Sequence, residues 1–87
     1  MVKKFYITTA IDYVNASPHV GHAFEKTLAD AIARWHRLQK KDVFFLTGVD
    51  ENAQKNVQAA EKLGIPVKEF VDKNTLLFIQ LCKKLNI

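Results

Sequence analysis

The sequence predicts an α/β fold built around parallel strands, and three observations lead to this prediction. Two short runs, residues 3–10 and 42–47, are rich in the aromatic and β-branched residues that favour strands. Between them, residues 20–39 carry apolar side chains at helical spacing. A strand, a helix and a second strand in this order are typical of a right-handed crossover between parallel strands.

The composition indicates a folded, soluble domain. The chain has 87 residues, 48% of them hydrophobic and 25% charged, without the bias of disordered or fibrous proteins. No apolar run approaches the ~20 residues needed to cross a bilayer. The single cysteine, Cys82, cannot form an internal disulfide, and no zinc-type spacing is present. We therefore expect a cytoplasmic protein with no membrane partner.

The net charge leaves two interpretations open. A formal charge of +4 suits a protein that meets polyanions, although the excess is modest for a nucleic-acid binder. Arg34, Arg37, Lys40 and Lys41 cluster at the end of the predicted helix, where cations favourably oppose the negative end of the helix dipole. The cluster is thus either a polyanion-facing patch or an ordinary solvated helix end.

The first half of the chain is expected to form a strand, a loop and a helix. The strand covers Lys3–Ala10, and the turn-forming residues of Asp12–Pro18 predict a loop. The helix covers Val20–Gln39 and presents one apolar face to the core. The residues of that face are Phe24, Leu28, Ala31, Ile32, Trp35 and Leu38.

The second half is expected to hold one strand and two helices. The apolar run Asp42–Thr47 suits a strand covered on both faces. A helix follows from Asp50 or Glu51 to Leu63. A third helix covers Val67–Leu85, with one largely apolar face. That face holds Val67, Phe70, Val71, Asn74, Phe78, Leu81 and Leu85.

Two strands alone make a poor sheet. The outer strand edges and the surplus apolar face of the third helix would stay open without further cover. The 87 residues are therefore expected to be part of a larger domain.

The most informative stretch is YVNASPHVGH, residues 13–22, between the first strand and the first helix. Ligands of open α/β folds bind at the carboxyl ends of the strands, and a helix start favours anions such as phosphate. His19 and His22 flank this helix start with Gly21 between them, which predicts a phosphate site. The alternative is that both histidines merely cap and pack the helix.

The motif HVGH is neither the G-x-G-x-x-G of dinucleotide binders nor a P-loop. In this position it resembles the first catalytic motif of class I aminoacyl-tRNA synthetases. The longer string ITTAIDYVNASPHVGHA, at residues 7–23, is similar to the opening of methionyl-tRNA synthetases. The strings ARWHRL (residues 33–38) and FFLTGVDE (residues 44–51) match that family as well, so the resemblance covers essentially the whole chain.

The resemblance implies a fold and an activity. Residues 1–87 would be the N-terminal half of the catalytic domain, the first βαβα half of a Rossmann-like (HUP-type) parallel-sheet nucleotide-binding domain. An inserted connective domain, the KMSKS loop and the anticodon-binding helices would lie outside it, and zinc is expected only there. The complete enzyme would activate methionine with ATP to methionyl-adenylate and transfer it to tRNA(Met), whereas the 87 residues alone are expected to be inactive.

The resemblance also implies roles for individual residues. His19 and His22 would be catalytic and hold the ATP phosphates, while Gly21 would lie against adenine. Mg²⁺ would accompany the ATP without a dedicated protein site, so no metal-binding residue is expected in the chain.

The methionine site would come from the ends of the strands. Asp50 would pair with the ammonium group, and Ala10, Ile11 and Tyr13 would line the amino-acid pocket. The residues themselves leave other interpretations open, because Asp50 could be a helix N-cap and Tyr13 an ordinary half-buried aromatic.

One departure from the family pattern bears on the site. Many members have Asp-Glu-His-Gly where this chain has Asp50-Glu51-Asn52-Ala53, so no histidine can act at position 52. Two other functions remain as alternatives: a nucleotidyltransferase of the wider HxGH group, and a non-catalytic truncated binding module.

Overall fold

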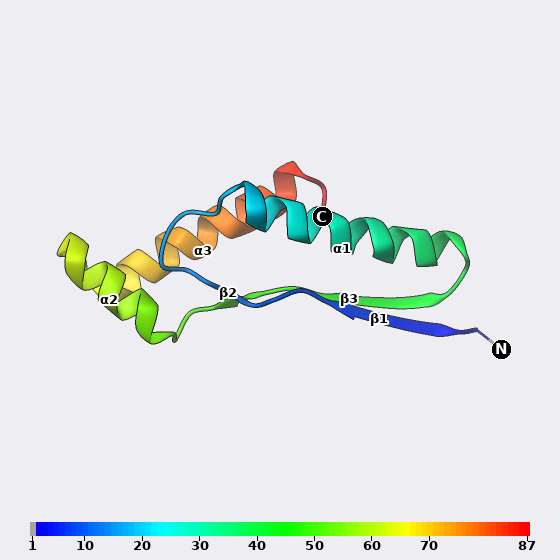
Figure 1. Cartoon of the computed structure of the whole chain (residues 1–87), viewed down its shortest axis with the longest axis horizontal. Coiled ribbons are helices and arrows are strands. Elements are labelled where there is room, and N and C mark those ends of the chain that lie inside the picture. The colour runs from blue at the N-terminus through cyan, green and yellow to red at the C-terminus, as the bar shows by residue number, and fades with distance from the viewer. Residues whose placement is uncertain (1) are drawn as a thin grey trace.

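The structure is a computed structural model that describes residues 2–87. Within this range, the chain forms four short strands and three helices, coloured from blue to red along the chain in Figure 1. In chain order they are β1 (Lys4–Thr8), β2 (Asp12–Tyr13), α1 (Val20–Leu38), β3 (Asp42–Leu46), β4 (Val49–Asp50), α2 (Gln54–Leu63) and α3 (Val67–Lys84).

The strands pair in parallel, which confirms the predicted crossover. β1 pairs with β3 from Lys4 opposite Asp42 to Thr8 opposite Leu46. Further along the same two segments, β2 pairs with β4, so that Tyr13 lies opposite Asp50. The prediction of a loop over Asp12–Pro18 was therefore wrong at its start. The two residues of β2 take strand geometry because β4 offers them a partner, which the turn-rich local sequence does not reveal.

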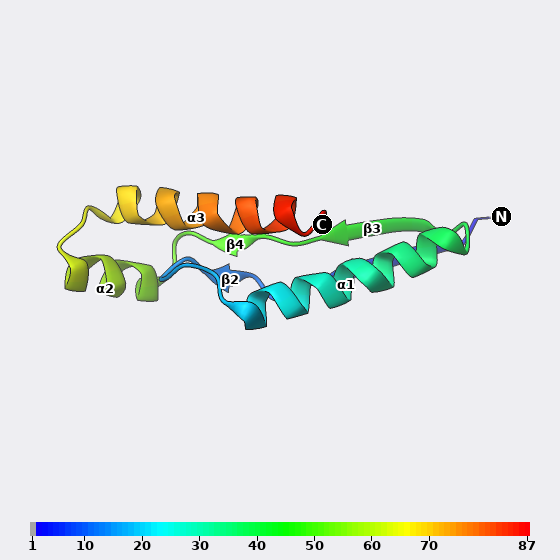
Figure 2. The same ribbon diagram turned by 90° about the horizontal axis from the view of Figure 1, so that it is seen from above.

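Helices α1 and α3 cover the same face of the strands. Figure 1 shows both helices above the strands. Figure 2 shows them offset along the long axis, so that only the start of α1 and the end of α3 overlap, with α1 along β1 and β3. The opposite face remains open in the part of the chain that the structure describes. Tyr6, Phe44 and Leu46 are exposed there, and the rings of Tyr6 and Phe44 lie 5.5 Å apart. The prediction that residues 42–47 are covered on both faces was thus wrong for Phe44 and Leu46 within residues 2–87.

The face of α1 that packs on the strands differs from the predicted one. Ala29 and Ala33 are buried against the sheet side, and so are Lys26 and Asp30. In contrast, Trp35 is 59% exposed. Two alanines one helical turn apart let the helix backbone approach the strands closely. The prediction was wrong because it assigned the face with the largest apolar side chains to the core. The large apolar residues left exposed on α1 are Val20, Phe24, Leu28, Ile32, Trp35 and Leu38.

A cluster of buried apolar residues lies where α3 packs on the segment after β2. Val14, Val71 and Phe78 form its centre. Asn74, the one polar residue in the predicted apolar face of α3, is also buried and donates a hydrogen bond of 2.8 Å to the carbonyl of Val14. The predicted face of α3 is confirmed at Phe70, Val71, Asn74 and Phe78, which are buried. It was wrong at Leu85, which is 42% exposed because the helix ends at Lys84. The amide of Asn74 gives the Val14 carbonyl a hydrogen-bond partner that this buried acceptor would otherwise lack.

Helix α2 begins later than the sequence predicted. Its N-cap is Ala53, which makes no side-chain capping bond, and its C-cap is Gly64 in the left-handed conformation, with φ 66°. Asp50 belongs to β4, three residues before this cap. No helix among residues 2–87 has both the length and the apolar content needed to span a membrane.

Candidate active site

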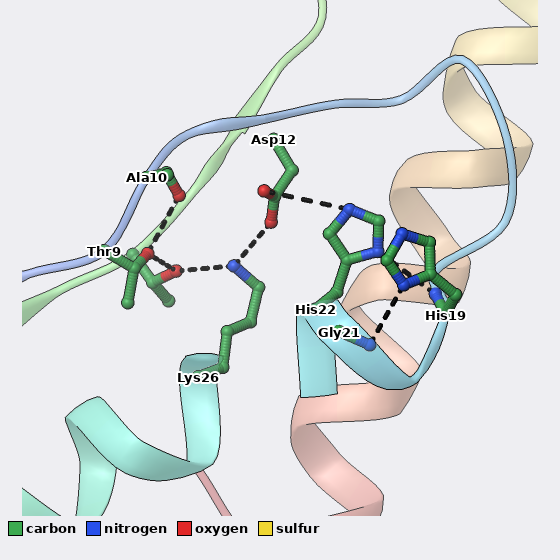
Figure 3. Close-up of polar contacts among 8 residues, drawn as sticks. Thr9, Ala10, Asp12, His19, Gly21, His22 and Lys26 are labelled. Atoms are coloured by element: carbon green, nitrogen blue, oxygen red, sulfur yellow. Dashed lines mark hydrogen bonds and ion pairs between the residues drawn. The ribbon is translucent and has the colours of Figure 1, made fainter. Parts of the chain in front are cut away.

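The two histidines of the HVGH motif stand at the start of α1 and cap it reciprocally (Figure 3). His19 is the N-cap residue, with extended backbone angles of φ −119° and ψ −179°. Its Nδ1 accepts a hydrogen bond of 2.9 Å from the amide of Gly21. The Nδ1 of His22 accepts a bond of 3.1 Å from the amide of His19. The two rings lie 4.0 Å apart at an angle of 37°.

This arrangement decides which nitrogen of each ring can act on a ligand. An Nδ1 that accepts an amide hydrogen is unprotonated, so the neutral ring carries its proton on Nε2. Both histidines therefore do cap the helix, as the alternative interpretation expected. Capping still leaves each ring with one N–H donor. His19 is exposed at the surface, and His22 is partly buried with its edge against the ring of Phe78, 5.1 Å between centroids.

Gly21 is required by the position of His19. A Cβ at residue 21 would stand 2.7 Å from Cε1 and 3.0 Å from Nδ1 of the His19 ring. Any side chain here would displace that imidazole, because contacts below 3.0 Å are essentially never tolerated between real Cβ atoms and their neighbours. The glycine thus maintains the capping geometry whether or not a ligand also approaches it.

A polar network that the sequence did not predict lies directly beneath the histidines. Lys26 follows His22 by one helical turn, and its ammonium lies 2.8 Å from Asp12 Oδ2 and 3.1 Å from Thr47 Oγ1. The hydroxyl of Thr47 in turn lies 2.6 Å from that of Thr9. The network joins the start of α1 to the segments that follow β1 and β3. The spacing of four between His22 and Lys26 places both on one helix face, but no sequence signal shows that Lys26 meets Asp12 and Thr47.

The predicted methionine residues Tyr13 and Asp50 are direct partners across β2 and β4. Asp50 Oδ1 accepts a hydrogen bond of 3.1 Å from the amide of Asn52, and its carbonyl accepts one of 2.8 Å from Asn56 Nδ2. The N-cap alternative for Asp50 was wrong, because Ala53 occupies the cap. The ammonium of Lys55 lies 5.6 Å from the centre of the Tyr13 ring. Tyr13 is 44% exposed, in keeping with the half-buried aromatic of the alternative interpretation.

Two cavities flank the ends of β1 and β3. One of about 370 Å³ is lined by Thr9, Ile11 and Thr47 among others. The second, about 420 Å³, includes Lys26 and Phe78 in its lining. Of the predicted methionine residues, Ile11 alone lines the first cavity. Ala10, Tyr13 and Asp50 lie outside both cavities, so the structure does not gather the predicted residues into one closed pocket.

The far end of α1 carries His36, in surroundings that lower its pKa. The ring of His36 stacks on Phe5, with centroids 3.5 Å apart, and its Nδ1 lies 2.8 Å from Lys41 Nζ. Loss of hydration and then the neighbouring Lys41 charge lower the pKa of His36 below its usual 6.5. Arg34 of the same basic cluster pairs with Asp30 at 2.7 Å. These intramolecular contacts favour the interpretation of the cluster as an ordinary helix end.

Residues 2–87 contain no group of three or more His, Cys, Asp or Glu side chains that could hold a metal ion.

Comparison with known proteins identifies relatives of the whole described range. The family model for tRNA synthetases class I (M) matches residues 5–87. Methionine–tRNA ligase of Brucella suis is 50% identical over 84 residues, covering 97% of this chain and 16% of the relative. That of Ureaplasma parvum is 49% identical over 85 residues, covering 98% and 16%. The chain therefore spans about one sixth of the length of these relatives.

A solved structure agrees with the sequence comparison. Mycobacterium tuberculosis methionyl-tRNA synthetase in complex with methionyl-adenylate superposes with a TM-score of 0.93 at 49% identity, covering 99% of this chain and 17% of that one. The predicted fold class, the first βαβα part of a Rossmann-like parallel-sheet domain, is confirmed by this match. On the family match and the fold together, the chain belongs to the class I tRNA synthetases of the methionine type.

Proposed function

We propose that this chain is a segment of a methionine–tRNA ligase, and that it binds ATP and methionine for the formation of methionyl-adenylate. The observation that carries the proposal is the 0.93 TM-score and 49% identity to a synthetase solved with methionyl-adenylate. The complete enzyme would then transfer the methionyl group to tRNA(Met). Its place of action would be the cytoplasm.

The two histidines would act on ATP through their Nε2–H groups. Because Nδ1 of each ring is engaged in capping, the remaining donor would serve a phosphate at the positive end of a 19-residue helix. His19 and His22 would stabilise the charge that develops on the phosphates when the methionine carboxylate attacks the α-phosphorus. A donor aimed at such charge contributes about 10²- to 10³-fold in rate. Mg²⁺ would arrive with ATP and neutralise part of the phosphate charge.

The methionine site would be built around the paired strands β2 and β4. Asp50 would bind the ammonium group, and its carboxylate is oriented by the amide of Asn52. Tyr13, opposite it in the register, would line the same pocket with Ala10 and Ile11. Gly21, which already admits the His19 ring, would let adenine lie against the backbone.

Residues 1–87 would form the N-terminal half of the catalytic domain. The remainder of that domain would cover the open face around Tyr6 and Phe44, and the exposed stripe of α1 around Trp35. The connective domain, the KMSKS loop and the anticodon-binding helices would lie in other parts of the complete enzyme, as would any zinc.

The test uses a chimeric synthetase in which residues 1–87 replace the matching segment of the M. tuberculosis enzyme. We expect it to exchange radiolabelled pyrophosphate into ATP only when methionine is present. The isolated 87 residues should show negligible exchange. A folded chimera without methionine-dependent exchange would contradict the proposal, and exchange driven by another acceptor would favour the nucleotidyltransferase alternative.

A further inference from the structure

The ammonium group of Lys26 is buried where a lone charge is costly. The side chain is 2% exposed, and an unpaired ammonium at such a position would lose most of its hydration without compensation. Its two contacts are Asp12 Oδ2 at 2.8 Å and Thr47 Oγ1 at 3.1 Å. The lysine therefore depends on Asp12, whose own side chain is 12% exposed.

The carboxylate of Asp12 lies between two basic groups and uses a different oxygen for each. Oδ2 meets Lys26, while Oδ1 lies 3.8 Å from Nε2 of His22 (Figure 3). This second distance is longer than a hydrogen bond, so the attraction is electrostatic and leaves Nε2–H available. The ring of His22 is thus held from two sides, by the His19 amide at Nδ1 and by the Asp12 charge at Nε2.

We propose that Asp12 and Lys26 are a positioning pair for His22, an inference that rests on the proposed function. Asp12 holds the Nε2 edge of His22 in the orientation that meets phosphate. Lys26 fixes Asp12 and cancels its charge, so that a carboxylate beside the phosphate site does not repel ATP. Neither residue touches the reacting atoms.

This arrangement makes a prediction that a purely structural cross-link does not. Removing the cation alone should leave a bare carboxylate beside the ATP site, and removing the anion alone should leave a bare cation. The first change repels ATP, whereas the second does not. Removing both charges restores neutrality while His22 stays unsupported. The KM of ATP should therefore rise only when the local charge becomes more negative, and kcat should fall whenever Asp12 is removed.

The experiment measures pyrophosphate exchange by the chimeric synthetase with three variants: Lys26→Met, Asp12→Asn and the double variant. For Lys26→Met we expect the KM of ATP to rise about tenfold, the order expected for an unscreened like charge a few ångströms away. For Asp12→Asn we expect kcat to fall about tenfold without a rise in the KM of ATP, since one donor is misaimed rather than removed. The double variant should recover the KM of ATP but keep the low kcat. The KM of methionine should change less than about twofold throughout, because these charges lie beside the phosphate end of the site.

The matched control is the ion pair between Lys68 and Asp72 on α3, which is 3.0 Å long and has side chains 88% and 57% exposed. Lys68→Met and Asp72→Asn should leave all constants unchanged. Melting temperatures of every variant report on folding. Should Lys26→Met fail to fold, Asp12→Asn and the double variant still test the turnover.

Three results would overturn the inference. One is a folded Asp12→Asn enzyme with unchanged kcat. Another is a KM of ATP that does not rise in folded Lys26→Met. The third is a rise in the KM of ATP that follows the fall in melting temperature and is not relieved in the double variant. Because the unmodified chimera must already be active, failure of the proposed function shows in the parent and failure of this inference only in the variants.

Discussion

The two ends of helix α1 both carry histidines, but the histidines stand in different surroundings. At the N-terminal end, His19 and His22 cap the helix beside charged neighbours, with Asp12 3.8 Å from His22. At the other end, His36 is stacked on Phe5 and faces the cation of Lys41. The first end lies where parallel strands finish and ligands bind, and the second where they begin. The position along the sheet, more than the residue type, therefore separates a candidate catalytic histidine from one that only packs.

The largest expected effect is a loss of stability, which should differ between the packing at the two ends of α1. Phe78→Ala removes a buried ring that contacts His22, and about 3 to 5 kcal/mol of unfolding free energy should be lost. Trp35→Ala at the far end, where the side chain is mostly exposed, should change stability by about 0.5 kcal/mol or less. Urea denaturation of the 87-residue chain compares the two, and equal losses would show that the far end is packed as tightly as the near one.

The second prediction concerns catalysis at the N-terminal end. His22→Ala in the chimeric synthetase should lower kcat for pyrophosphate exchange by about 10²- to 10³-fold, since a donor to developing charge is lost. The KM of methionine should barely change. His36→Ala is the matched control and should keep normal turnover. An active His22→Ala enzyme would mean that this ring has no contact with the reacting phosphate.

A smaller effect is expected at Asp50, on the strand pair next to the N-terminal end. Asp50→Ala should raise the KM of methionine by about 10- to 100-fold, because a hydrogen bond between charged groups contributes about 1.5 to 3 kcal/mol. The KM of ATP should stay close to normal. A steady-state titration of methionine at saturating ATP measures the change. If both constants rise equally, Asp50 serves the strand pairing and not the ligand.

The smallest effect concerns the titration of His36 at the C-terminal end of α1. The pKa of His36 is lowered by lost hydration and by Lys41, so the unfolded chain binds more protons than the folded one as pH falls below 6.5. The free energy of unfolding is therefore highest above pH 6.5 and decreases as pH falls from 6.5 toward the lowered pKa of the folded state. NMR titration of the ring should give a midpoint below 6.5, and Lys41→Gln should move it upward. A midpoint at or above 6.5 would contradict the prediction.

Much of the local structure could be predicted from the sequence because its signals are short-range. The start of α1 at Val20 and its end near Gln39 follow from periodicity and turn residues, and the buried face of α3 follows from the spacing of Phe70, Val71 and Phe78. The family motif also located the helix start that His19 and His22 cap. These features depend on residues within a few turns of one another.

Contacts between distant segments could not be predicted in the same way. Strand β2 forms because β4 lies beside it, and α1 packs through its alanines because close approach to β1 and β3 favours small side chains. The ion pair of Lys26 with Asp12 joins a helix to a strand 14 positions earlier. No local pattern specifies which charge a buried lysine meets.

Local sequence was therefore enough to predict the two longer strands, the three helices, their order and the position of the histidine motif at a strand-to-helix turn, because backbone propensity and capping act over neighbouring residues. The tertiary structure alone decided which face of α1 is buried, where Asp50 lies and which groups surround His22. Those outcomes depend on packing and on charge pairs between segments that only folding brings together.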